Sequence, residues 1–123
     1  MPITIDRSDS GALTTFTVSG KLTLPELIGV LGRYGRNGPT RYELYDLRSL
    51  TGERLSSADI HSLIAFFGKY PKARPPESKT AVLVASDIDF GIGRMVSMIS
   101  DGQVPFKIDV FRSLDKALSW LRS

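Results

Sequence analysis

A chain of 123 residues can bury one hydrophobic core but is too short for two ordinary domains, so we expect residues 1–123 to form a single domain. The hydrophobic content of 41%, the charged content of 24% and the net charge of +3 are those of an ordinary globular protein, and no apolar run approaches the roughly 18 residues of a membrane span. The absence of cysteine excludes disulfides and cysteine metal sites, and the first residues do not resemble a secretory signal, so we expect a cytoplasmic protein.

The first half of the chain predicts two strands, a helix and a third strand. Short β-branched stretches over 3–5 and 13–18, separated by the polar sequence RSDSG, indicate a hairpin. The sequence TLPE, which begins at Thr23, is a capping box with proline in the first turn, and apolar residues then recur at helical spacing. We therefore expect a helix over 24–34, followed by a strand over 42–47.

The second half predicts two further strands and three helices. A helix after residue 56 is indicated by apolar residues at helical spacing, namely Ile60, Leu63, Ile64 and Phe67. The apolar run TAVLVA over 80–85 is typical of a parallel strand covered on both faces, and the sequence FKIDVF over 106–111 predicts the last strand. Ser86 begins a helix whose expected buried stripe is Ile88, Ile92, Met95, Val96 and Ile99. Ser113 begins a helix expected to bury Leu114, Ala117, Leu118 and Leu121.

Strands that alternate with single helices imply right-handed crossovers. The fold class predicted by this order is α/β, with a mainly parallel five-stranded sheet, an antiparallel edge strand and four helices.

Four stretches of the chain resemble a known family. VSGKLT, YELYDLRSL, TAVLVASD and KIDVFRSLDKALSWL, in this order and in a chain of this length, are similar to the SpoIIAA-like proteins, which are related to STAS domains. The resemblance implies a single SpoIIAA-like, STAS-like domain over 1–123. STAS domains of the anti-sigma-factor-antagonist type act without catalysis, by binding a partner protein, and are switched by phosphorylation of a serine where a helix begins after the third strand. The chain also resembles the lipid-carrying Sec14-type domains, in fold alone, so an apolar ligand stays a possible alternative.

The resemblance places the regulatory serine at Ser56 or Ser57. Asp46 and Leu47 match the Asp-Leu pair that ends the family's third strand, but the residues around the serines differ from the family's motif. The differing residues are Leu55, where the family has an acid, and Ala58-Asp59, where it has glycine and leucine.

Both serines also have a purely structural interpretation. Either hydroxyl could cap the helix, because the first backbone N–H groups of a helix have no partner within it. A phosphate would also be favoured at this end of the helix dipole, although Asp59 already places a negative charge in the same turn.

Polar residues follow several of the predicted strands. Since ligands bind beyond the carboxyl ends of parallel strands, we expect a ligand or partner surface there. Its candidate residues are Asp46, Arg48, Ser56, Ser57, Ser86, Asp87 and Arg112, with Ser113 beside the last of them. The alternative is that each residue is only a helix cap or part of a solvated turn.

The opposite edge of the sheet is predicted to be basic. Its residues are Arg33, Arg36, Arg41, Lys69, Lys72, Arg74 and Lys79. Such a rim would attract phosphate or anionic lipid, or would only be solvated. No aromatic stacking pattern accompanies it, so no specific nucleic acid is expected.

Catalytic patterns are sparse. His61 lies one helical turn after Ser57, which leaves a hydrolase-like pair as an alternative, but no activating acid is in place. One histidine and no cysteine leave no ordinary metal site, and the glycines of GIGRMV lie inside a predicted helix rather than at a nucleotide-binding turn. We expect no cofactor.

The sequence therefore predicts a non-enzymatic binding or regulatory module for a protein partner or a small apolar or anionic ligand. The alternatives are a phosphorylation-switched regulator that uses Ser56 or Ser57 and a hydrolase-like enzyme. Phe66 could line a groove or a homodimer surface together with Met95 and Met98, or these residues could belong to the core.

Overall fold

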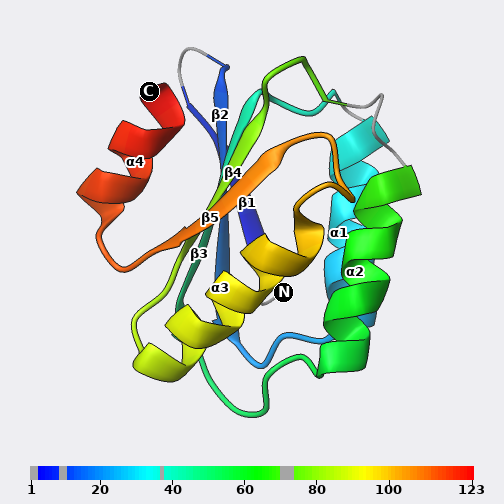
Figure 1. The fold of residues 1–123 in the computed structure, drawn as a ribbon, viewed down its shortest axis with the longest axis vertical. Coiled ribbons are helices and arrows are strands. Elements are labelled where there is room, and N and C mark those ends of the chain that lie inside the picture. The colour runs from blue at the N-terminus through cyan, green and yellow to red at the C-terminus, as the bar shows by residue number, and fades with distance from the viewer. Residues whose placement is uncertain (1–2, 9–10, 37, 70–73) are drawn as a thin grey trace.

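The computed structural model describes residues 3–8, 11–36, 38–69 and 74–123. The elements alternate as the sequence predicts (Figure 1). In chain order they are β1 (Ile3–Arg7), β2 (Leu13–Gly20), α1 (Leu24–Arg36), β3 (Tyr42–Leu50), α2 (Ser57–Lys69), β4 (Lys79–Leu83), α3 (Asp87–Ser100), β5 (Lys107–Phe111) and α4 (Leu114–Arg122).

The five strands form one sheet in the order β1-β2-β3-β4-β5. β1 pairs antiparallel with β2, and every other neighbouring pair is parallel. The predicted mainly parallel sheet with an antiparallel edge strand is confirmed. The carboxyl ends of β3 and β4 therefore meet at one edge, which is the lower end of the molecule in Figure 1.

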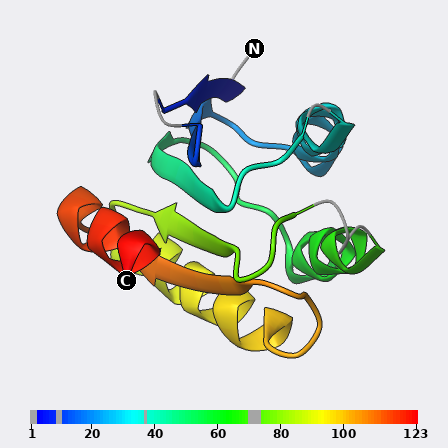
Figure 2. The same cartoon turned by 90° about the horizontal axis from the view of Figure 1, so that it is seen from above.

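The helices form two layers on the sheet. α1 and α2 lie on one side of it and α4 on the other (Figure 2). The core beneath α1 includes Phe16, whose ring stacks on Tyr45 at 4.5 Å between centroids and meets Tyr34 edge-on at 4.9 Å. A second cluster, which includes Leu83 and Leu121, packs beneath α4. Side chains on both faces of β4 are buried or half-buried, as its apolar run predicts.

α3 packs against β5 at a glycine. A Cβ atom on Gly93 would lie 2.5 Å from Cγ2 of Val110, far inside van der Waals contact. Only a residue without a side chain allows this approach. Gly93, the second glycine of the GIGR sequence, is therefore a packing residue between α3 and the sheet.

β3 is longer than predicted. It continues to Leu50 because its pairing with β2 resumes after a bulge, where Ser19 meets Ser49 and Gly20 meets Leu50. Asp46 and Arg48, which we expected beyond the strand, therefore lie within it.

Two residues expected in the core are exposed. Ile88 keeps 75% of its surface accessible and Leu114 keeps 38%. Both lie in the first turn of their helices, at the carboxyl edge of the sheet, where the helix projects past the strands. The buried stripes that contain Ile88 and Leu114 are wrong at these two positions.

Candidate functional site

Asp46 and Arg48 form a two-pronged ion pair on β3. Nε of Arg48 donates to one carboxylate oxygen at 2.9 Å, and Nη2 donates to the other at 2.8 Å. These hydrogen bonds lower the pKa of the Asp46 carboxyl, and burial opposes them only in part. The pair is half exposed, and each member already satisfies the other.

The beginning of α2 is a reciprocal cap. Oγ of Ser56 accepts from the backbone N–H of Asp59 at 3.1 Å, and the Asp59 carboxylate accepts from the backbone N–H of Ser56 at 3.2 Å. Ser57 is the first helical residue, and both serines are exposed. The helix-cap interpretation is confirmed for Ser56, whose hydroxyl also remains accessible.

The beginning of α3 carries a second charged pair. Oγ of Ser86 accepts from the backbone N–H of Asp89 at 3.1 Å, so Ser86 is the N-cap. Asp87 forms an ion pair with Arg112, whose guanidinium also lies 5.0 Å from the centre of the Phe90 ring. The Asp46–Arg48 and Asp87–Arg112 pairs thus both consist of predicted edge residues. The exposed Ile88 follows directly after Asp87.

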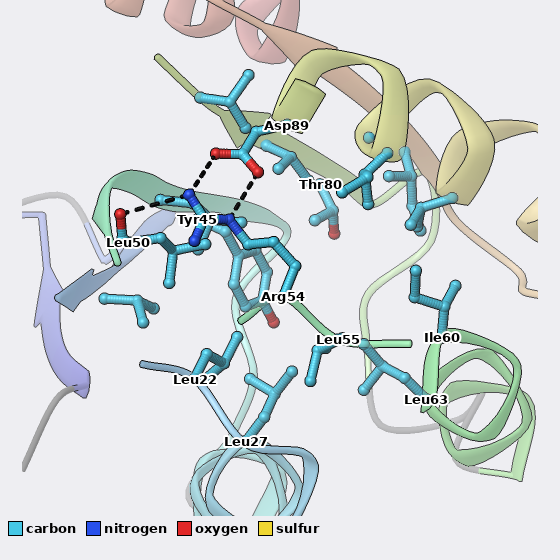
Figure 3. A pocket seen from close by; sticks show the side chains of 18 of the residues that line it. Leu22, Leu27, Tyr45, Leu50, Arg54, Leu55, Ile60, Leu63, Thr80 and Asp89 are labelled. Atoms are coloured by element: carbon cyan, nitrogen blue, oxygen red, sulfur yellow. Dashed lines mark hydrogen bonds and ion pairs between the residues drawn. The ribbon is translucent and has the colours of Figure 1, made fainter. Parts of the chain in front are cut away.

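A cavity lies between the sheet and the helices α1, α2 and α3, all of which contribute residues to its lining (Figure 3). Its volume is about 140 Å³. Most of its walls are apolar, and its lining includes Val18, Leu22, Leu27, Tyr45, Leu47, Leu50, Leu55, Ile60, Leu63, Phe67, Thr80, Val82, Val84, Ile92, Val96 and Ile108. Each of these residues fits an ordinary core pattern, so no signal in the sequence distinguishes the cavity from a filled core.

The charged residues Arg54 and Asp89 meet at this cavity. Nε of Arg54 donates to one carboxylate oxygen of Asp89 at 2.8 Å, and Nη2 donates to the other at 3.1 Å (Figure 3). The Arg54 side chain is 30% exposed and that of Asp89 is 9% exposed. The hydrogen bonds from Arg54 hold the pKa of Asp89 below its usual range, against the effect of burial. Neither Arg54 nor Asp89 was a predicted site residue, because no local pattern joins two residues that lie 35 positions apart.

A second buried charge lies nearer the amino ends of the strands. Oε1 of Glu43 accepts from the hydroxyls of Tyr45 at 3.3 Å and Thr80 at 3.4 Å, and its other oxygen lies 3.3 Å from Nε of Arg74. Burial raises the pKa of Glu43, although the Arg74 charge opposes this. Burial raises the pKa of Tyr45 well above its usual range. This group links β3, β4 and the chain before β4.

Three residues of the predicted basic rim already have partners within the fold. Arg74 is buried against Glu43, and Arg41 pairs with Glu77 at 3.0 Å. Nζ of Lys79 donates to backbone carbonyls at the end of α4, at 2.8 and 3.0 Å. Lys72 lies outside the described residues. Because these charges are already partnered, the amino edge offers less to an anion than the sequence indicates.

The hydrolase-like pair does not have the expected contact. Nδ1 of His61 lies 2.8 Å from the backbone carbonyl oxygen of Ser57, to which it can only donate. A histidine that activates a serine must instead accept a proton from the hydroxyl. Across residues 3–8, 11–36, 38–69 and 74–123, no three acidic or histidine side chains gather in a way that could hold a metal ion. In the same ranges, no helix has the length and apolar character needed to cross a membrane.

Comparisons with known proteins bear on the fold. No family model matches the sequence, and no curated protein matches it. Among solved structures, an uncharacterised DUF3478-family protein with a SpoIIAA-like fold from Shewanella loihica PV-4 is 21% identical, with a TM-score of 0.62 over 97% of this chain and 91% of that one. An anti-sigma factor antagonist from Mycobacterium paratuberculosis is 20% identical, with a TM-score of 0.65 over 98% of this chain and 93% of that one. The chain has the SpoIIAA-like fold that the sequence predicts.

Proposed function

We propose that this chain is a non-enzymatic binding module that regulates a partner protein, which it contacts through the carboxyl edge of its sheet. The observation that carries the proposal is the exposure of Ile88, which keeps 75% of its surface accessible at the first turn of α3. The mycobacterial protein with the same fold is an anti-sigma factor antagonist. Regulation by protein binding fits that likeness.

The surroundings of Ile88 fit a protein interface. The Asp87–Arg112 ion pair lies beside it, and the exposed cap of α2 lies at the same end of the molecule (Figure 1). A central apolar anchor with a polar, charged rim is the usual anatomy of a protein interface. We assign the predicted edge residues to this rim. The absence of cysteine is in keeping with the cytoplasm as the proposed compartment.

Site-specific photo-cross-linking tests this proposal in the native host. A photo-reactive amino acid replaces Ile88 in one variant and Met98, which is 72% exposed on the same helix, in the matched control. We expect one partner protein to cross-link at position 88 and not at position 98, and added unlabelled chain to suppress the adduct. Equal labelling at both positions would contradict a surface centred on Ile88. The homodimer surface predicted around Phe66, Met95 and Met98 stays a prediction, and an adduct between two copies at position 98 would support it.

The phosphorylation switch is favoured by a specific observation, the accessibility of the Ser56 hydroxyl at the first turn of α2. A phosphate there would meet the positive end of the helix dipole, but it would also meet the Asp59 carboxylate. Mass spectrometry of the chain from its host, grown under several conditions, tests this version. Unmodified Ser56 and Ser57 peptides under all of them would rule it out.

A second candidate function is the binding of a small apolar ligand, which the cavity of about 140 Å³ favours. A ligand in that cavity would contact α1, α2 and α3 together and could alter how they pack. Binding of fluorobenzene, followed by fluorine NMR, tests it, and the absence of any saturable binding would count against it.

A further inference from the structure

We infer that the chain segment 51–56 is a lid over the apolar cavity, that Arg54 and Asp89 are its latch, and that the site takes one apolar molecule of about the size of a single aromatic ring. This inference rests on the apolar-ligand function proposed above and deepens it. It concerns the size class of the ligand and the control of its access.

The cavity volume sets the size class. A cavity of about 140 Å³ is close to the engineered protein cavity of about 150 Å³ that binds benzene or xenon and stays free of water. A long acyl chain would need several times this space. The site is therefore suited to a single ring or a short branched chain and not to a membrane lipid.

The polar atoms of the wall indicate that the ligand is apolar. The hydroxyls of Tyr45 and Thr80 already donate to Glu43, and the charges of Arg54 and Asp89 are used on each other. Glu53, the remaining charged residue of the lining, is exposed to solvent. A buried water or polar ligand needs hydrogen-bond partners, and these wall groups already have theirs. An apolar ligand needs none, and it gains by leaving water.

The lid is held in place at several points. The Arg54 guanidinium donates to the carbonyl oxygens of Gly52 at 2.7 Å and Leu50 at 3.4 Å, which braces it within its own segment. It then reaches across the cavity to Asp89 on α3 (Figure 3). The neighbouring Leu55 lines the cavity, so displacement of this segment would uncover it.

The latch is of a kind that can open. The Arg54 side chain is 30% exposed and its two hydrogen bonds to Asp89 can be exchanged for water, whereas the walls beneath are packed core. The lid also carries Ser56, the N-cap of α2. Movement of the lid would thus displace one part of the proposed partner surface, so a ligand could influence partner binding.

Fluorine NMR of fluorobenzene with the full chain tests both parts of the inference. Arg54→Met removes the latch charge but keeps the apolar stem, and Arg54→Lys keeps the charge without the two-pronged geometry. The matched control is Arg41→Met. Arg41 forms an ion pair with Glu77, at 3.0 Å between Nη2 and Oε2, and neither residue lines the cavity. Val96→Phe fills the cavity, and Val82→Leu is the milder filling variant if the first does not fold.

The expected result separates rate from affinity. We expect one saturable site in the wild type and in Arg41→Met, and its loss in the filling variant. In Arg54→Met the exchange rate should rise by about tenfold while the affinity changes by less than about twofold, because a lid acts on binding and release alike. The exchange rate of Arg54→Lys should lie between those of the wild type and Arg54→Met.

Two other results would each overturn a different part of the inference. If fluorobenzene binds neither the wild type nor Arg54→Met, or if it binds the filled variant equally well, the cavity is not a ligand site and the apolar-ligand function fails. If it binds and is blocked by filling, but exchanges at the same rate in Arg54→Met and Arg41→Met, the ligand site stands and the latch is wrong.

Discussion

Replacement of Gly93 by alanine tests how closely α3 must approach the sheet. The new Cβ would lie 2.5 Å from Cγ2 and 2.8 Å from Cβ of Val110, where ordinary contacts begin near 3.4 Å. Forcing an extra carbon into a packed site costs about 1–3 kcal/mol, and alanine returns about 1 kcal/mol through its higher helix propensity. We therefore expect Gly93→Ala to destabilise the chain or to leave it unchanged.

Gly91→Ala is the matched control in the same helix. Nothing lies within 4 Å of a Cβ built on Gly91, so this variant should gain the helix propensity without the clash. The two variants should then differ by the clash alone, about 2 kcal/mol in the free energy of unfolding. For a chain of this size, that corresponds to about 8 °C in Tm.

Thermal and urea denaturation, followed by far-ultraviolet circular dichroism, measure this difference. Val110→Ala removes the Cγ atoms that the new methyl group meets, so it should cost less stability when added to Gly93→Ala than when added to the wild type. Equal Tm values for Gly93→Ala and Gly91→Ala would refute the close packing of α3 on β5. The position of Asp89, and with it the proposed latch, would then need revision.

Three further outcomes follow from the same structure. Arg74→Met should cost about 3–5 kcal/mol in unfolding free energy because it strands a buried Glu43 carboxylate, and adding Glu43→Gln should restore much of that loss in urea titrations. The pKa of Asp89 is lower in the folded chain than its unfolded value near 3.8, so the ionised carboxylate stabilises the fold above that pH, and this stabilisation is lost as the pH falls through the folded pKa. Asp89→Asn should therefore flatten the acid side of a profile of Tm against pH. An unchanged acid side would contradict the ion pair. Ser56→Ala should lose about 1 kcal/mol as a lost N-cap, whereas Ser57→Ala should change stability by less than about 0.5 kcal/mol; equal losses in chemical denaturation would mean that the cap is misassigned.

The elements and their order follow from local signals. At the predicted capping box, the backbone N–H of Glu26 donates to the Thr23 hydroxyl at 3.4 Å, and this hydroxyl donates to the Glu26 carboxylate at 2.8 Å. Ser86 and Ser113 cap α3 and α4 as predicted. Each of these signals acts within four residues, so neighbouring side chains alone carry it. The mainly parallel sheet follows from the alternation of strands and helices.

Burial at the helix ends and the partners of charged residues could not be predicted in this way. Ile88 fits the helical period of its stripe, yet it is exposed because the helix begins beyond the strand ends. Arg74 looks like one more basic residue before a strand, but it is buried against Glu43, 31 positions earlier in the chain.

The element order, the helix caps and the position of a candidate edge can be predicted from short stretches of sequence, because hydrophobic period and capping are properties of a few adjacent residues. The cavity of about 140 Å³ under that edge, and the reach of Arg54 across it to Asp89, arise only when the layers pack together. A cavity is the space that side chains from all layers together fail to fill, and the two charges lie 35 positions apart in the chain. Periodicity can assign a residue to the core, but it contains no information on how completely that core is filled.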